Sequence, residues 1–406
     1  MLEILFWAFV GPAALAAVYS IRTGRHWQEH VEGQLRPMLL DEDEEDEEEP
    51  EPWTPPATLI LPVKGVDHDL AEALRSLAAQ DYPDYELLIA ARSANDPALQ
   101  TVRMTLGDKA RVVIAGPPPA GTGEKVHNLL AAVAAARPES AVLAFADSDA
   151  QVAPAWLRAL AAPLADETLG AATGFRWYFP EDGGFWPLLR SVWDSTIAGA
   201  MRADRKNFCW GGAMALRCET FKRAGVERFW RGTVSDDYRL SAAMHAAGLG
   251  VEFVPGAMAA TPGGCTAREF LSWARRQLVI TKVYNKKIWI AGFIAHIVYC
   301  GAILMSLLLA ANGNPLGLGG LVVAIIPGMA KGGMRGYAAQ LMFPEREAWL
   351  ERFGWAYFWF TPIATWIWLW AFFASATTRR IEWRGYVYEL SAADSTRTLA
   401  APAENL

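Results

Sequence analysis

Between residues 57 and 150, short apolar runs alternate with amphipathic stretches. Apolar runs bounded by turn-forming residues predict buried strands, and the stretches between them have helical spacing. We expect strands at Ala57–Leu61, Tyr85–Ala91, Arg111–Ala115 and from Val142 onward, with helices near residues 70–79, 97–106 and 125–136. Strands that alternate with helices pair in parallel, so the pattern predicts a doubly wound α/β sheet.

Four longer apolar segments lie outside this region. Residues 4–19 are almost wholly apolar and precede Arg22, Arg25 and His26. A signal peptide would carry its positive charges before the apolar segment, so this order indicates a membrane anchor whose following side is cytoplasmic. The three late candidates are Ile288–Ala311, Leu316–Ala330 and Trp355–Ala376.

Four crossings conflict with the distribution of charge. If residues 20–287 are cytoplasmic, three late spans leave the C-terminus outside, although Arg379, Arg380 and Arg384 favour the cytoplasmic side. One of the late segments would then be re-entrant or lie in the membrane interface, and the sequence leaves open which.

Composition supports a membrane protein with a charged linker. Of the 406 residues 52% are hydrophobic and 18 are Trp, which is unusual for a soluble enzyme. Ten carboxylates between Asp41 and Glu51 outweigh the net charge of −7, so the rest of the chain is slightly basic. Such a block, followed by a Pro-rich stretch, predicts a solvated linker over residues 41–56. The four cysteines show neither zinc-type spacing nor a short disulfide framework.

Two carboxylates follow the fourth predicted strand. Asp147 and Asp149 flank Ser148 at its end, where open α/β sheets bind their ligands. Neighbouring carboxylates repel one another unless a cation lies between them, and hard oxygen ligands suit Mg²⁺ or Mn²⁺. A helix N-cap or a turn would use the same residue types.

Other stretches also carry candidate chemistry. Asp236 and Asp237 open a predicted helix, where acids are stabilised by the helix dipole or could act as a general base. Gly211 and Gly212 permit close approach of the backbone to a ligand, or form a tight turn. Cations between residues 268 and 286 would flank a membrane helix, hold a departing diphosphate, or do both.

Taken together, these motifs resemble the membrane-bound glycosyltransferases of family 2, an inverting class. The likeness is nearest to the ceramide glucosyltransferases and to the bacterial group that glycosylates hopanoids or other lipids. The matching stretches are Leu61–Gly65, Gln80–Glu86 with Asn95–Ala98, Gly123–Lys125 with Asn128, Asp147–Asp149 and Asp236–Tyr238.

The resemblance implies a GT-A fold, a doubly wound mixed sheet flanked by transmembrane helices. It places an anchor at 1–22, the linker at 41–56, a cytoplasmic catalytic domain at 57–287, a membrane region at 288–376 and a C-terminal tail at 377–406. The protein would be integral to the membrane, the inner membrane if its source is bacterial.

The resemblance also implies roles for single residues. Asp147 and Asp149 would hold Mg²⁺ or Mn²⁺ at the diphosphate of a nucleotide sugar, and Asp237, next to Asp236, would deprotonate the acceptor hydroxyl. Gly211 and Gly212 would lie near the acceptor. The donor-binding residues implied by the motifs are Pro62, Asp96, Lys125 and Arg276.

Two positions depart from the family pattern. Arg92-Ser93 stands where a nucleotide-contacting Asp is usual, so Asp96 would replace it or base recognition would differ. The stretch from Arg276 to Ile280 lacks the closing Arg-Trp that holds the acceptor in processive synthases, which argues against polymer synthesis. Trp383-Arg384-Gly385-Tyr386 resembles a C-terminal element of the lipid-directed group.

These features favour transfer of one hexose, from UDP-glucose, to a lipid hydroxyl such as that of ceramide or a hopanoid, with no nucleic-acid partner. A polysaccharide or polyprenyl-phosphate glycosyltransferase is the alternative within enzymes. A catalytically silent relative that binds nucleotide or lipid is the alternative outside them.

Overall fold

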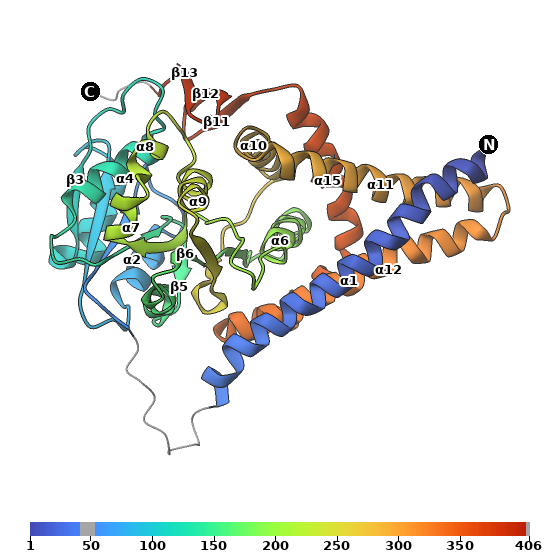
Figure 1. Ribbon diagram of the computed structural model, residues 1–406, viewed down its shortest axis with the longest axis horizontal. Helices are drawn as coiled ribbons and strands as arrows, with labels where there is room; N and C mark the ends of the chain where they lie inside the picture. The colour runs from blue at the N-terminus through green and yellow to red at the C-terminus, as the bar shows by residue number, and fades with distance from the viewer. Residues whose placement is uncertain (41–52, 403–406) are drawn as a thin grey trace. The chain divides into compact units, whose positions relative to one another are not determined.

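The computed structural model describes residues 1–40 and 53–402, and these fall into two compact units. The sheet unit comprises the described residues within 39–177, 201–263 and 379–406. The helical unit comprises residues 1–38, 178–200 and 264–378. Most of the predicted acidic linker, residues 41–52, lies outside the described residues (Figure 1).

A seven-stranded mixed sheet forms the centre of the sheet unit, in the order β3-β2-β1-β4-β8-β6-β9. Strands β1 to β4 pair in parallel, whereas β8 runs antiparallel to both β4 and β6. The prediction of a doubly wound mixed sheet is therefore confirmed. The strands are β1 (Ala57–Pro62), β2 (Tyr85–Ala91), β3 (Arg111–Ile114), β4 (Val142–Ala146), β6 (Leu169–Thr173), β8 (Ala213–Arg217) and β9 (Gly250–Phe253).

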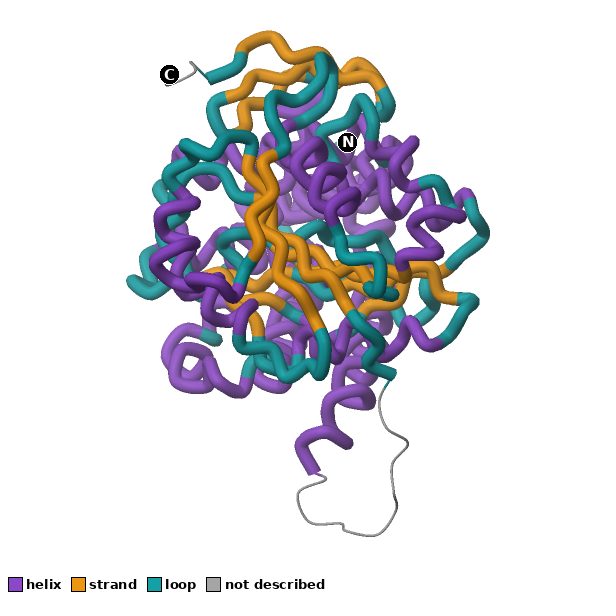
Figure 2. The backbone as a smooth tube through the Cα atoms, turned by 90° about the vertical axis from the view of Figure 1, so that its left-hand side faces the viewer, coloured by secondary structure: helices purple, strands orange, loops and turns teal. Residues whose placement is uncertain are grey.

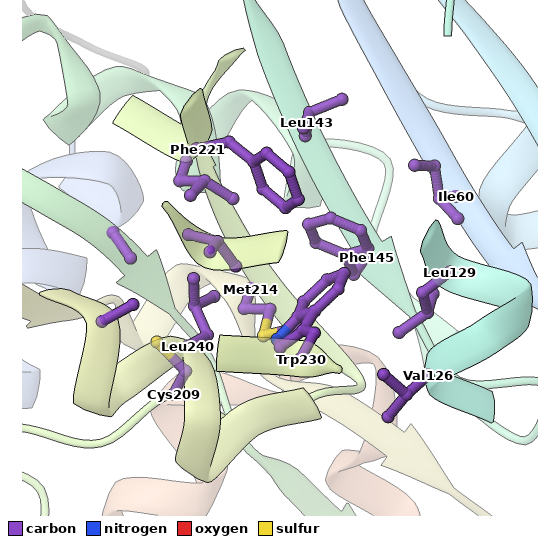
Figure 3. Close-up of a cluster of buried hydrophobic side chains, with 14 of the residues drawn as sticks. Ile60, Val126, Leu129, Leu143, Phe145, Cys209, Met214, Phe221, Trp230 and Leu240 are labelled. Carbon is purple, nitrogen blue, oxygen red and sulfur yellow. The ribbon is translucent and has the colours of Figure 1, made fainter. Parts of the chain in front are cut away.

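Helices connect these strands and bury their apolar faces against the sheet. They are α2 (Leu70–Ala78), α3 (Ala98–Leu106), α4 (Glu124–Ala135), α5 (Trp156–Ala161), α7 (Cys218–Arg223), α8 (Val226–Trp230) and α9 (Asp236–Ala246). One core cluster joins α4, α8 and α9 to β1, β4 and β8 (Figure 3). At its centre the fully buried Trp230 meets Phe145 and Phe221 edge-on, with ring centroids 5.6 and 5.5 Å away. Because this cluster fixes α4 and α9 against the carboxyl end of β4, it positions the side chains described below.

Two smaller sheets complete the strand content. One has the order β5-β10-β7, with β5 (Gln151–Val152), β7 (Arg176–Tyr178) and β10 (Ala259–Thr261). The other is an antiparallel meander of β11 (Arg380–Trp383), β12 (Tyr386–Ala392) and β13 (Ser395–Ala400). These last strands come from the residues expected as a C-terminal tail. They belong to the sheet unit and lie beyond one end of the central strands (Figure 2).

The helical unit contains the apolar segments. Its helices are α1 (Leu2–Leu40), α6 (Phe185–Ala198), α10 (Ala267–Tyr284), α11 (Lys286–Ala311), α12 (Leu316–Met342), α13 (Glu347–Phe353), α14 (Trp355–Trp359) and α15 (Thr361–Ala376). Apolar side chains of α1, α11 and α12 pack into one cluster, and the three helices run side by side (Figure 1). In the described part of the chain, these three helices are long and apolar enough to cross a membrane.

Two of the predicted late segments differ from the structure. The segment predicted as Leu316–Ala330 continues as a helix to Met342. The longer helix includes the polar Arg335, whose side chain is buried and donates to Ser195 Oγ at 3.2 Å and to Thr361 Oγ1 at 3.0 Å. The segment predicted as Trp355–Ala376 is broken at Phe360, and Pro362 lies in the first turn of α15. The 16 residues of α15 extend about 24 Å, less than the ~30 Å hydrocarbon core of a bilayer.

Candidate active site

Lys125 joins two carboxylates that come from distant parts of the chain. It lies in the first turn of α4, and its Nζ is 2.8 Å from Asp147 Oδ1 and 3.1 Å from Asp236 Oδ2. Asp147 directly follows β4, while Asp236 begins α9. All three side chains are largely buried, since Lys125 is 17%, Asp147 23% and Asp236 4% exposed. The predicted residues Asp147, Asp236 and Lys125 therefore form one cluster at the carboxyl end of β4.

The two glycines before β8 lie directly against this cluster. A Cβ on Gly211 would collide with Asp236 Oδ2, and it would come within 2.9 Å of Lys125 Nζ. A Cβ on Gly212 would collide with the ring of Trp210 and approach Asp147 Oδ2 to 2.9 Å. Glycine is needed at both positions because the carboxylates pack on the bare backbone.

Burial and charge act in opposite directions on these groups. Burial raises the pKa of Asp236 to about 6, and the charge of Asp237 adds to the rise although Lys125 opposes it. For Asp147, burial also acts to raise the pKa, but the Lys125 ammonium outweighs it and the pKa lies below its usual value. Burial would lower the pKa of Lys125, yet its two carboxylate partners raise it above the ordinary value.

Asp237 has a different environment from its neighbour. Its Oδ1 accepts from Ser235 Oγ at 2.5 Å and from the backbone N of Tyr238 at 2.7 Å. Ser235 is also the N-cap of α9, so the same hydroxyl that starts the helix fixes the carboxylate. Among the described residues, no hydrogen bond or ion pair reaches Asp237 Oδ2. Asp237 thus presents one oriented, accessible oxygen beside the buried pair of Asp236 and Lys125.

The second carboxylate after β4, that of Asp149, is 37% exposed. Its Oδ2 is 3.8 Å from Arg176 Nη1. Burial raises its pKa, and the charge of Asp147 adds to the rise although Arg176 opposes it. Two carboxylates of this kind fit Mg²⁺ or Mn²⁺, which complete their coordination with water and phosphate oxygens rather than with a full protein cage. In the described residues, no group of three or more His, Cys, Asp or Glu could hold a metal ion.

Ser148, between the two carboxylates, connects the site to the C-terminal strands. Its Oγ donates to Asp67 Oδ2 at 2.5 Å, and Arg384 Nη2 donates to the same oxygen at 2.8 Å. Arg384 Nη1 donates in addition to the carbonyl oxygen of Lys64 at 3.0 Å. The turn between β11 and β12 therefore reaches the loops that follow β1 and β4.

A second polar network lies around the buried Glu124. Its Oε2 accepts from Tyr386 Oη at 2.5 Å and is 3.2 Å from Lys64 Nζ. Arg92 Nη1 donates to Tyr386 Oη at 2.8 Å, and Lys64 Nζ lies 4.0 Å from the centre of the Tyr386 ring. Burial is the largest cause that raises the pKa of Tyr386, and Glu124 adds to it. Arg92, in the Arg92-Ser93 stretch where the resemblance led us to expect an Asp, thus binds the C-terminal strands.

The remaining predicted donor residues have mainly structural contacts. Asp96 Oδ1 accepts from the backbone N of Gly65 and of Ala98, both at 2.9 Å, so it joins the loop after β1 to the start of α3. Pro62 is the buried last residue of β1. Arg276 belongs to α10 in the helical unit.

Sequence reasoning did not assign roles to Asp67, Arg92, Glu124, Arg176 and Arg384. Arg176 has no motif, and Asp67 lies beyond the end of the first-strand motif. Glu124 and Arg92 stand within or beside recognised motifs, but their partner Tyr386 is more than 250 positions away in the chain. The Trp-Arg-Gly-Tyr stretch had been noted for its resemblance to a C-terminal element, but the sequence did not indicate its contacts.

Comparison with known proteins gives a family match over nearly the whole chain. Residues 13–396 match the model of "Glycosyl transferase family 21". A segment of 92 residues is 33% identical to ceramide glucosyltransferase 1 of Caenorhabditis elegans; it spans 22% of this chain and only 20% of that relative. The resemblance to ceramide glucosyltransferases noted from the sequence is thereby confirmed, and the GT-A fold that it implies agrees with the mixed sheet described above.

Solved structures give further likenesses. A mannosyltransferase from Pyrobaculum calidifontis, in complex with GDP-Man and Mn²⁺, is 20% identical, with a TM-score of 0.48 over 93% of this chain and 98% of that one. Glucosyl-3-phosphoglycerate synthase from Mycobacterium tuberculosis, in complex with Mn²⁺, UDP and glucosyl-3-phosphoglycerate, is 17% identical, with a TM-score of 0.37 over 55% of this chain and 78% of that one.

Replacement of Lys125 by Met should destabilise the protein in a pH-dependent way. Removal of one partner from a buried ion pair costs roughly 3 kcal/mol, because the carboxylates of Asp147 and Asp236 lose their cation. Without Lys125 the pKa of Asp236 should lie above its wild-type value of about 6, because the ammonium that opposes the rise is gone. The folded variant then takes up this proton at a higher pH than the folded wild type, so the loss should shrink as the pH falls from 7.5 toward 5. Chemical unfolding in the presence of EDTA measures this difference. The exposed Lys109→Met serves as the control, and a loss of stability that is equal at both pH values would contradict the account.

Proposed function

Because the chain belongs to glycosyl transferase family 21, we propose that it is an inverting enzyme that moves one hexose, glucose from UDP-glucose, to a membrane lipid hydroxyl. Ceramide and hopanoids are the acceptor classes that the sequence favours, and the short match to a ceramide glucosyltransferase supports the first. The observation that carries the proposal is the pairing of Lys125 with both Asp147 and Asp236 at the carboxyl end of β4. Asp149 lies two residues after Asp147, and Asp237 directly follows Asp236.

Asp237 is the general base in this proposal. A base needs one oxygen within hydrogen-bond reach of the acceptor proton and a fixed orientation. Ser235 and the backbone of Tyr238 hold Oδ1 of Asp237, which leaves Oδ2 for the acceptor hydroxyl. Asp236 is unsuited to this role because it is 4% exposed and paired with Lys125. The deprotonated hydroxyl attacks the anomeric carbon from the face opposite the leaving UDP, so the configuration inverts.

Asp147 and Asp149 are the residues that would hold Mg²⁺ or Mn²⁺ in this proposal. A bound divalent cation would offset the charge that develops on the leaving diphosphate. Lys125 supports the same oxygens, because its ammonium keeps Asp147 ionised and oriented. Asp96 and Pro62 are proposed as donor contacts on the nucleotide side. Asp96 accepts from the backbone N of Gly65 in the loop after β1, and Pro62 is the last residue of β1. Arg276 is proposed as a further donor contact.

In this proposal the apolar helices hold the enzyme at the membrane that contains its lipid acceptor. A lipid acceptor stays in the bilayer while the nucleotide sugar is soluble, so the enzyme must present its sheet unit at the membrane surface. Residues 379–402 belong to the same unit as residues 53–177, and the two parts must therefore lie on one side of the membrane. Crossings by α11 and α12, which are long and apolar enough to span a bilayer, would satisfy this requirement. In this proposal α15 lies in the interface, and the charges after α1 and around Arg379 favour the cytoplasm for the sheet unit.

Transfer of label from UDP-glucose tests the proposal directly. Membranes that contain the protein, supplied with Mg²⁺ or Mn²⁺, should form a single labelled glycolipid. Asp237→Asn should lower the rate by at least about 1,000-fold because only the proton acceptor is lost, while UDP-glucose binding is retained. The exposed Asp108→Asn is the matched control.

Other outcomes of this assay separate the alternatives. Label in insoluble polymer or in a polyprenyl phosphate would replace the lipid assignment. An absence of label with every donor sugar and either metal would favour a silent relative. Asp237→Asn with most of its activity intact would contradict the assignment of the base.

Asp149→Ala should weaken donor binding in a metal-dependent way. Loss of one of two carboxylates at the cation site should lower the affinity for UDP-glucose about tenfold or more in Mn²⁺, since the bridging ion is held less tightly. The affinity measured in EDTA should be the same for the variant and the wild type. Equal affinities in Mn²⁺ would rule out Asp149 as a metal ligand.

A further inference from the structure

A two-residue turn carries Arg384 to the carboxyl ends of β1 and β4. Arg384 and Gly385 connect β11 to β12, and both have positive φ, at 50° and 81°. Two-residue hairpin turns of this kind favour Asn or Asp followed by Gly, and a long side chain with positive φ is uncommon. Backbone held in such a conformation is strained, and strain of this kind is a pointer to function.

The guanidinium of Arg384 lies in the cluster of acids at the candidate active site. It binds Asp67 Oδ2 at 2.8 Å, the oxygen that also accepts from Ser148 between the two metal carboxylates. Through this shared oxygen, Arg384 is joined to the segment that carries Asp147 and Asp149. In turn Asp67 raises the pKa of Arg384 against the effect of burial.

Arg384 also has N–H donors that are available to a ligand. Within the described residues its hydrogen bonds to Asp67 and to Lys64 O use two of its five N–H donors. Its side chain is 38% exposed, so the remaining donors are open to a ligand. A guanidinium presents its donors in a planar fork that matches phosphate oxygens.

The other cations at the site are already committed. Lys125 is held between Asp147 and Asp236, and Arg176 lies beside Asp149 with its guanidinium 5.1 Å from the Trp210 ring centre. A diphosphate brings more negative charge than one divalent cation neutralises, and charge that develops on a leaving group needs fixed positive partners.

We propose that Arg384, carried by the C-terminal hairpin, binds the diphosphate of the nucleotide-sugar donor. This inference rests on the proposed function and adds to it a donor-binding role for Arg384, a residue to which the sequence assigned no role at the site. Tyr386 holds the hairpin in place, because its hydroxyl donates to Glu124 and accepts from Arg92. The C-terminal strands then form one wall of the donor site.

Nucleotide binding to the purified full-length protein in detergent tests the inference. With Mn²⁺ present, Arg384→Gln should weaken UDP binding by about 10- to 100-fold, the effect of a lost charge-assisted contact. Uridine, which lacks phosphate, should bind both proteins equally in competition measurements. Arg397→Gln, an exposed Arg on β13 of the same sheet, should bind UDP as the wild type does.

A second variant separates binding of phosphate from support of the loops. Asp67→Asn removes the carboxylate that competes for the guanidinium, so UDP affinity should be retained or increased. If Asp67→Asn weakens UDP binding as much as Arg384→Gln does, Arg384 acts through Asp67 and the inference is wrong. Unchanged UDP affinity in Arg384→Gln would also overturn it.

Two further outcomes keep the test decisive. If Arg384→Gln does not fold, Arg384→Lys is measured in its place: weaker UDP binding with intact uridine binding supports the inference, and unchanged UDP binding overturns it. A wild-type protein that binds neither UDP nor GDP would contradict the proposed function itself, and the inference with it.

Discussion

The candidate active site depends on one ammonium group shared by two carboxylates. Lys125 lies between Asp147 at the end of β4 and Asp236 at the start of α9. Without it, the acids at the carboxyl end of β4 would repel one another in a largely buried place. The glycines before β8 allow this close packing, since a side chain at Gly211 would displace Asp236. The ion pairs therefore fix the geometry in which Asp237 keeps a free, oriented oxygen.

The C-terminal strands give Arg92 a structural partner. Arg92 donates a hydrogen bond to Tyr386 of β12. The same tyrosine binds Glu124 next to Lys125, so the strands that follow the membrane helices are part of the sheet unit.

Local patterns predicted the first half of the sheet closely, because each strand there is a short apolar run between turn residues. The Asp147–Asp149 pair could be found for the same reason, since a strand end is visible in sequence. The contacts of Arg384 and Tyr386 could not be predicted, because they join residues far apart in the chain. The late segment predicted from hydropathy ends at Ala330, whereas helix α12 continues to Met342. A hydropathy scale treats Arg335 as a polar residue that avoids burial, but in the structure two hydroxyl groups accept hydrogen bonds from its buried side chain.

The central claim is a single displacement driven by one carboxylate base, with no covalent nucleophile. The stereochemistry of the product tests it most directly. The glucose of UDP-glucose is α-linked, so the anomeric proton of the purified glycolipid should show the coupling of a β-glycoside in its NMR spectrum. An α-linked product would mean retention of configuration and would contradict the account of Asp237 and of the site around it.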